Sequence, residues 1–135
     1  MPRLLLAVVC DDVRIEAGHK HSLMGLFDTF SVADFAQPLP IFHVFARVAL
    51  DDTSAHDIVM HLHSDAGDFQ IQVPVRVQAH GRDEASGCYV ATLNVALNGI
   101  RVPRPGTYHI GFTVSGSELG GPSLLVRANQ PPTLQ

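Results

Sequence analysis

The sequence is poor in lysine and has no long apolar run, and each shortage excludes a class of protein. Lys20 is the only lysine, and 9 basic residues stand against 13 acidic ones, giving a formal net charge of −4. Nucleic acids and anionic membranes bind clustered lysine and arginine, so neither is expected as a partner. Because no apolar run approaches the roughly 20 residues of a membrane-spanning helix, we expect a soluble, cytoplasmic protein.

Cysteine is also scarce, since Cys10 and Cys88 are the only two in 135 residues. Two thiols are too few for a disulfide framework, and both lie in strand-like apolar runs, which favours buried free cysteines in a reducing compartment. A Cys10–Cys88 bridge is the alternative. Residues 4–10 also have some features of an export signal ending at a lipid-modified cysteine, but the run is short and Val9 is bulky at that position.

What the sequence does contain is alternation. In residues 69–79 apolar side chains alternate with Gln, Pro and Arg, and the same period of two recurs in residues 58–62, 89–97 and 108–114. This period is typical of strands with one buried and one exposed face. The sequence therefore predicts a single all-β domain over residues 1–128, an antiparallel β-sandwich of about eight strands. These strands are expected near residues 3–10, 21–32, 40–50, 57–64, 69–79, 88–97, 107–114 and 123–128.

Three further features refine this picture. Residues 129–135 contain two prolines, which lack amide donors, so they are interpreted as a Pro-rich C-terminal tail. Pro74 lies on the outward side of a strand and removes a ladder donor, which predicts an edge strand. Phe45 points outward from the strand over residues 40–50, so we expect that face to be covered by the N-terminal segment, the tail or another subunit.

The sequence contains no recognisable catalytic motif. No serine lies in Gly-x-Ser-x-Gly, and the glycines near residues 116–121 do not have the spacing of a phosphate loop. The best metal candidate is the pair His61 and His63, because residues two apart on a strand project from the same side. Two imidazoles can begin a zinc, copper or nickel site, with a third ligand from a neighbouring strand that the sequence does not identify. Solvated surface histidines are the simpler interpretation.

Strand parity predicts that the domain is electrically polar. If each strand crosses the sandwich once, successive loops alternate between its two ends. One end then collects the acidic residues Asp11, Asp12, Glu16, Asp51, Asp52, Asp83, Glu84 and Glu118. The opposite end receives Asp34, Asp65 and Asp68 balanced by Arg101 and Arg104. The acidic end is interpreted as a surface for a basic protein partner or for calcium, unless its carboxylates serve only turns and solubility.

A resemblance follows from short motifs spread along the chain. They are Val9-Cys10-Asp11-Asp12, Gly18-His19-Lys20, Leu23-Met24-Gly25-Leu26-Phe27-Asp28, Pro40 and Pro105-Gly106-Thr107-Tyr108. The pattern resembles an uncharacterised family of short bacterial proteins known only as a domain of unknown function. The resemblance implies a compact all-β domain from bacteria or their phages and brings no activity or cofactor. Within the motif, Gly25 is expected to permit a bulge or a close backbone approach.

Together these features favour a protein that is not an enzyme and needs no cofactor. We expect it to act through protein–protein contacts, as an accessory or structural subunit of a bacterial or phage assembly or as a homo-oligomer. The alternative is a metal- or small-ligand-binding protein that uses the outward face around His61 and His63.

Overall fold

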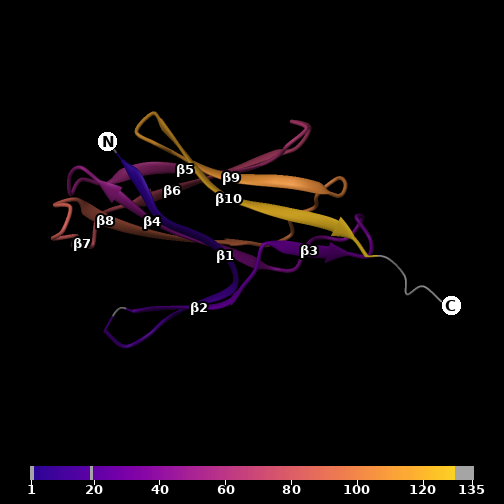
Figure 1. Cartoon of the computed structure of the whole chain (residues 1–135), viewed down its shortest axis with the longest axis horizontal. Coiled ribbons are helices and arrows are strands. Elements are labelled where there is room, and N and C mark those ends of the chain that lie inside the picture. The colour runs from indigo at the N-terminus through magenta and orange to yellow at the C-terminus, as the bar shows by residue number, and fades with distance from the viewer. Residues whose placement is uncertain (1, 19, 130–135) are drawn as a thin grey trace.

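A computed structural model describes residues 2–18 and 20–129, and within them the chain is an all-β sandwich of two curled five-stranded sheets (Figure 1). The ten strands are β1 (Arg3–Ile15), β2 (His21–Leu26), β3 (Thr29–Val32), β4 (Phe42–Leu50), β5 (His56–Ser64), β6 (Gln70–Val77), β7 (Gly81–Arg82), β8 (Tyr89–Leu97), β9 (Gly106–Val114) and β10 (Ser117–Ala128). Sheet A has the order β2-β1-β4-β8-β7 and sheet B the order β3-β10-β9-β5-β6. The predicted fold class is confirmed, with ten strands instead of eight.

The core lies between the two sheets and is built by the alternation seen in the sequence. On β4 and β5 every second side chain is fully buried, and β8 and β9 contribute in the same way. Tyr108, Phe42 and Phe112 are among the largest side chains that are fully buried there. Apolar burial of this kind supplies most of the stability of such a sandwich.

One segment crosses from sheet to sheet and explains much of the extra strand count. Residues 21–32, expected as one strand, divide into β2 in sheet A and β3 in sheet B. Phe27, in the connection between the two strands, and Phe30, within β3, both point toward the core. There Phe30 packs against Phe42, with ring centroids 5.2 Å apart. Strand β3 then pairs with β10 in parallel, the one parallel ladder among the described strands.

The edge predicted from Pro74 is confirmed, because β6 is the outermost strand of sheet B. Pro74 lies opposite Val59 of β5, and along β6 exposed residues alternate with partly buried ones. A proline on an edge strand limits unwanted pairing with other chains.

The first strand departs from the expected pattern through a bulge. The register of β1 against β4 shifts between Leu4 and Leu6, so one extra residue is inserted. Leu4, Ala7 and Val9 consequently face the core, whereas an uninterrupted alternation would place Cys10 on the same face as Leu4. Cys10 is fully buried as predicted, but outside the main core, and Cys88 is only partly buried. Both cysteines are free.

The second half of β1, residues 10–15, pairs with β2 to form a hairpin arm, called the β1–β2 arm below (Figure 1). This arm lies against the outer side of β4. Phe45 points away from the core, yet it is only 1% exposed. The ring of His21 on β2 lies 5.2 Å from the ring of Phe45, and the guanidinium carbon of Arg47 lies 6.0 Å from it. The predicted cover for Phe45 is therefore this arm of the same chain.

The predicted tail over residues 129–135 falls outside the described residues except for Asn129, whose amide donates to the carbonyl of Val32. In the described ranges there is no helix long and apolar enough to cross a membrane.

Candidate functional site

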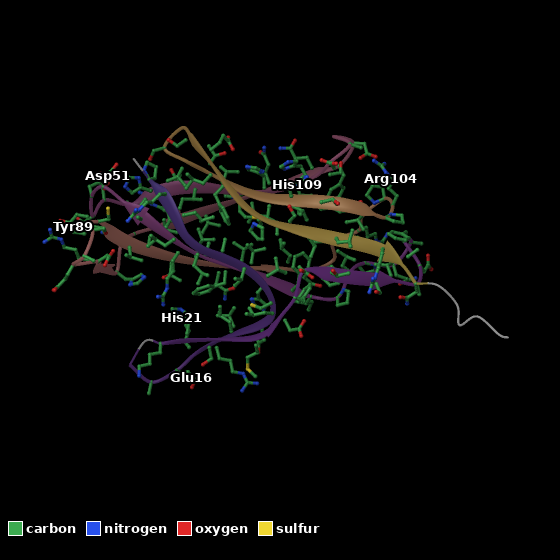
Figure 2. The ribbon with its side chains drawn as sticks, viewed as in Figure 1. Glu16, His21, Asp51, Tyr89, Arg104 and His109 are labelled. Carbon is green, nitrogen blue, oxygen red and sulfur yellow. The ribbon has the colours of Figure 1, made fainter. Side chains whose placement is uncertain are left out.

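A row of three histidines lies on the outer face of sheet B, and Figure 2 labels one of them, His109. His61 and His63 project from β5, and His109 projects from β9 directly opposite His63 in the ladder. The ring centroids of His63 and His109 are 5.5 Å apart, and those of His61 and His63 are 5.3 Å apart. The prediction that His61 and His63 share a face is confirmed, and His109 joins them from the neighbouring strand.

Glu118 on β10 is bonded to this row. Its Oε2 lies 3.2 Å from Nε2 of His61, and its Oε1 accepts a hydrogen bond of 2.7 Å from the hydroxyl of Thr113. These bonds, with that of Thr113 first, lower the pKa of Glu118 below its ordinary value, so the carboxylate is ionised near neutral pH. An ionised carboxylate only accepts hydrogen bonds, so Nε2 of His61 carries the proton.

The other nitrogen of His61 faces its neighbour. Nδ1 of His61 lies 3.3 Å from Nδ1 of His63. Burial, followed by the like charges of His61 and His109, lowers the pKa of His63, so its imidazole is neutral near neutral pH. Beside the two rings is an open hollow of about 330 Å³, lined on the β6 side by Gln70 and Gln72.

The imidazole of His61 lies against Gly111, its ladder partner on β9. A Cβ atom at residue 111 would overlap the ring, with Nε2 only 2.9 Å away. Glycine weakens a strand interior, and Gly111 has no unusual backbone angle that requires it. The position of His61 is therefore accommodated by a residue without a side chain.

Both nitrogens of His109 are engaged by side chains outside the histidine row. Nε2 lies 3.1 Å from Oδ1 of Asp65, and Nδ1 lies 3.0 Å from the hydroxyl of Ser123. In the described part of the chain no group of three or more His, Cys, Asp or Glu side chains is already arranged around one point to hold a metal ion. The two side chains available as metal ligands are thus those of His61 and His63.

The predicted acidic end is correct in part. Asp51 and Asp52 follow β4, Asp83 and Glu84 precede β8, and Leu50 pairs with Tyr89, so these four residues share one end of the sandwich (Figure 2). Strand β5 separates Asp51 and Asp52 from Asp65 and Asp68, as strand parity predicted.

Asp11 and Asp12 do not belong to that end, and their assignment is wrong. Cys10 pairs with His43 at the start of β4, whereas Asp51 follows the last residue of β4, eight residues after His43. The physical reason is that β1 continues past its pairing with β4 and pairs with β2, so Asp11 and Asp12 lie within a strand and not in a loop at the end of the sandwich. Glu16 lies on this arm as well (Figure 2).

Asp52 and Asp83 form hydrogen bonds within their own loops. Oδ1 of Asp52 accepts from the amide of Ser54 and lies 2.7 Å from Nε2 of His56, and bonds from these two residues, Ser54 first, lower the pKa of Asp52 to about 2. Asp83 accepts a 2.7 Å hydrogen bond from the hydroxyl of Ser86. This end shows turn chemistry, which is the simpler of the predicted interpretations.

A second feature lies along the seam between the sheets. Residues 3–8 of β1 pair with β4 on one side, and among the described residues no strand pairs with their other side, because β2 joins only from Cys10. Strand β10 lies next to this edge, and on the side away from β9 no described strand pairs with it before Leu125. Two shallow hollows of about 250 and 360 Å³ follow the seam, lined mainly by residues 4–9 and 120–123.

The seam is apolar and accessible. Leu5 and Leu6 are 42% and 40% exposed, and Leu26 at the far end of the seam is 62% exposed. The two facing edges are unequal. Both edges carry a register shift, in β1 between Leu4 and Leu6 and in β10 between Gly120 and Ser123. Pro122, however, removes an amide donor from β10, whereas residues 3–8 of β1 contain no proline. The β1 edge is therefore the one able to pair with another strand.

Comparison with known proteins identifies the family. A model for a family of unknown function, DUF6941, matches residues 5–127, which is most of the chain. The chain belongs to DUF6941. The predicted resemblance to an uncharacterised family is thereby confirmed, and in this DUF6941 chain two of the quoted motif segments, residues 9–12 and 23–28, pair with each other in the β1–β2 arm.

No curated protein matches the sequence. Among solved structures, the cupredoxin domain of amoB from Nitrosocaldus yellowstonii is similar in fold over 70% of this chain and 63% of that chain. The sequence identity is 15% and the TM-score is 0.35.

Proposed function

We propose that this DUF6941 protein is a binding module that accepts an extended segment of a partner protein along the β1 edge, residues 3–8. The observation that supports the proposal is the edge itself, which has backbone groups without a strand partner beside two exposed leucines. Addition of a strand to such an edge gives affinity through main-chain hydrogen bonds and specificity through alternate side chains. This role matches an accessory subunit of a larger assembly.

The shape of the seam favours a single extended segment over a folded surface. Residues 120–123 of β10 form the opposite wall, and the β1–β2 arm closes the edge from Val9, whose carbonyl accepts from the amide of Phe27. A second folded copy would bring its own β10 wall against this one. An extended, apolar peptide segment contacts both walls, with its side chains against Leu5 and Leu6.

The test is partner retention measured by native mass spectrometry on protein purified gently from its own host. Leu5→Lys and Leu6→Lys place a charge at the edge and are expected to lower the retained partner at least about tenfold, the effect of losing a central apolar contact. Ile15→Lys, on the same strand but at the exposed end of the arm, is the matched control and should retain the partner.

All three substitutions change exposed side chains, so folding stability should move by no more than about 0.5 kcal/mol. Equal retention in the edge variants and the wild type would contradict the proposal. A homo-oligomer that Leu6→Lys dissociates would assign the edge to a second copy instead. Replacing both His61 and His63 should leave partner retention unchanged.

A further inference from the structure

The histidine row on sheet B suggests a second activity, independent of the proposed function because no residue of the β1 edge takes part. We propose that His61 and His63 bind one divalent transition-metal ion of the zinc type through their Nδ1 atoms, while Glu118 positions the imidazole of His61. Remaining coordination sites open into the hollow beside Gln70 and Gln72.

The two Nδ1 atoms are separated by the distance expected for a pair of zinc ligands. Zinc bound by imidazole has Zn–N distances of about 2.0–2.1 Å in tetrahedral geometry, so two ligating nitrogens stand about 3.3 Å apart. Nδ1 of His61 and Nδ1 of His63 lie 3.3 Å apart. The two donor atoms therefore already have the spacing of a ligand pair and need no backbone movement.

The tautomer of His61 also suits a metal ligand. A ligating histidine commonly donates its other ring N–H to a carboxylate, which fixes the ring and makes the ligating nitrogen more basic. Here Nε2 of His61 donates to Oε2 of Glu118, which Thr113 holds in place. Nδ1 of His61 is thus left with a lone pair directed at His63.

The surroundings of His61 hold its ring in one place. The ring of His61 lies against Gly111, where any side chain would displace it, and only 15% of the His61 side chain is exposed. A solvated surface histidine requires neither a glycine beneath it nor a carboxylate at its far nitrogen. Imidazole donors select late transition ions over Mg²⁺ or Ca²⁺, which prefer oxygen.

The test is calorimetric titration of Zn²⁺ into the chelator-treated full chain, with Mg²⁺ as the comparison ion. We expect one Zn²⁺ per chain and no uptake of Mg²⁺. His61→Gln and His63→Gln should abolish Zn²⁺ binding, whereas His109→Gln, which removes a histidine bonded to Asp65 and Ser123, should change the affinity less than about threefold. Circular dichroism confirms that each variant folds.

The role of Glu118 is tested separately. Glu118→Ala should weaken Zn²⁺ binding about 10- to 100-fold, and Glu118→Gln, which keeps an acceptor oxygen, should recover part of that loss. Nitrogen chemical shifts of the His61 ring should report the Nε2–H tautomer in the wild type and lose that preference in Glu118→Ala. A purely structural role for Glu118 would not move these shifts.

Two glycine variants test the site without substituting any of the proposed ligand residues. Gly111→Ala should displace the His61 ring and weaken Zn²⁺ binding, whereas Gly120→Ala, whose Cβ meets nothing within 4 Å, should not. Absence of stoichiometric Zn²⁺ uptake by the wild type would overturn the proposal. So would uptake that persists after both His61 and His63 are replaced, or equal loss in His109→Gln, since each places the ion elsewhere.

Discussion

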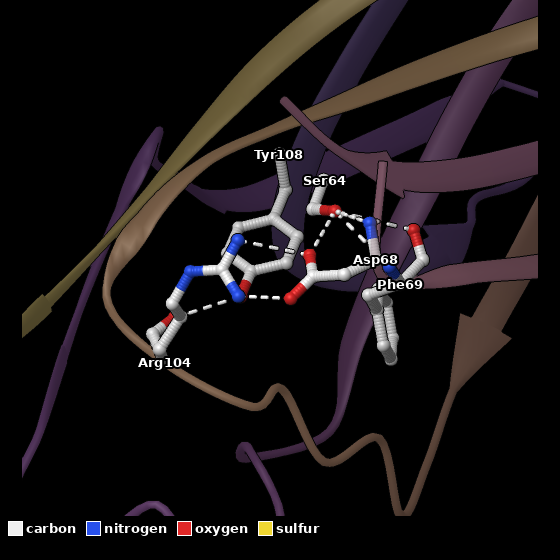
Figure 3. A network of polar contacts seen from close by, with 5 residues as sticks. All are labelled: Ser64, Asp68, Phe69, Arg104 and Tyr108. Carbon is white, nitrogen blue, oxygen red and sulfur yellow. Dashed lines mark hydrogen bonds and ion pairs between the residues drawn. The ribbon is translucent and has the colours of Figure 1, made fainter. Parts of the chain in front are cut away.

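At the scale of single residues, the strongest polar network closes the hairpin between β5 and β6 (Figure 3). The hydroxyl of Ser64, the one buried polar residue of the described chain, accepts from the amides of Asp68 and Phe69 at 3.1 Å and donates to Oδ1 of Asp68 at 2.8 Å. Arg104 forms a two-pronged ion pair with the same carboxylate, and the hydroxyl of Tyr108 donates to the carbonyl of Arg104. The network ties two loops together at one end of the sandwich.

This network predicts a loss of stability in acid. Hydrogen bonds from Arg104, and secondarily from Ser64, lower the pKa of Asp68 to about 2, below its ordinary value of about 3.9. A lowered pKa stabilises the fold above the unfolded-state pKa, and this contribution is lost as the pH falls through about 2. The free energy of unfolding, measured with denaturant, should therefore fall more steeply from pH 5 to pH 2 in the wild type than in Asp68→Asn.

Asp52→Asn is the comparison for that experiment, because the pKa of Asp52 is also about 2 and its loop lies at the other end. Each of the two substitutions should reduce the fall in the free energy of unfolding between pH 5 and pH 2. A pH dependence of Asp68→Asn identical to that of the wild type would show that the ion pair does not contribute.

A second residue-scale prediction concerns the core. Phe112 is fully buried between the sheets, as the alternation in β9 predicted. Phe112→Ala should lower the free energy of unfolding by about 3–5 kcal/mol, because it removes buried apolar area and leaves a cavity. The shift is measured as the urea midpoint at constant slope. A near-zero shift would mean that this face of β9 is not the inner one.

At the scale of elements, the β1–β2 arm depends on one close contact. Gly25 has a φ of +70°, and a Cβ there would overlap the carboxylate of Asp11 on the paired strand. The expectation that Gly25 permits a close approach is confirmed. The arm in turn covers Phe45, so loosening the arm exposes an aromatic ring on sheet A.

Gly25→Ala should destabilise the protein by more than about 1–2 kcal/mol, the cost of a left-handed backbone for alanine, because overlap with Asp11 adds to it. Gly18→Ala is the matched control, since Gly18 has a φ of +78° and open space around it. Chemical unfolding of the two variants separates the backbone cost from the contact. Equal destabilisation of both would show that the approach of Asp11 contributes nothing.

At the scale of the whole molecule, sequence reasoning reached the sandwich, the edge position of Pro74 and the shared face of His61 and His63. Each depends on period-two alternation or on a missing amide, both of which are local properties. The bulge near Leu5 and the departure of β1 into an arm were missed, because an inserted residue reverses the faces without interrupting an all-apolar run. Glu118 and Gly111 joined the histidine site through strand order, which alternation does not encode.

The central claim is that residues 3–8 of β1 receive a partner strand. Hydrogen–deuterium exchange of the host-purified complex, compared with the isolated protein, measures this directly because main-chain pairing slows amide exchange. We predict new protection confined to residues 3–8 and the facing residues 120–123. Unchanged exchange along β1, with protection appearing instead at β6 or β7, would contradict the claim.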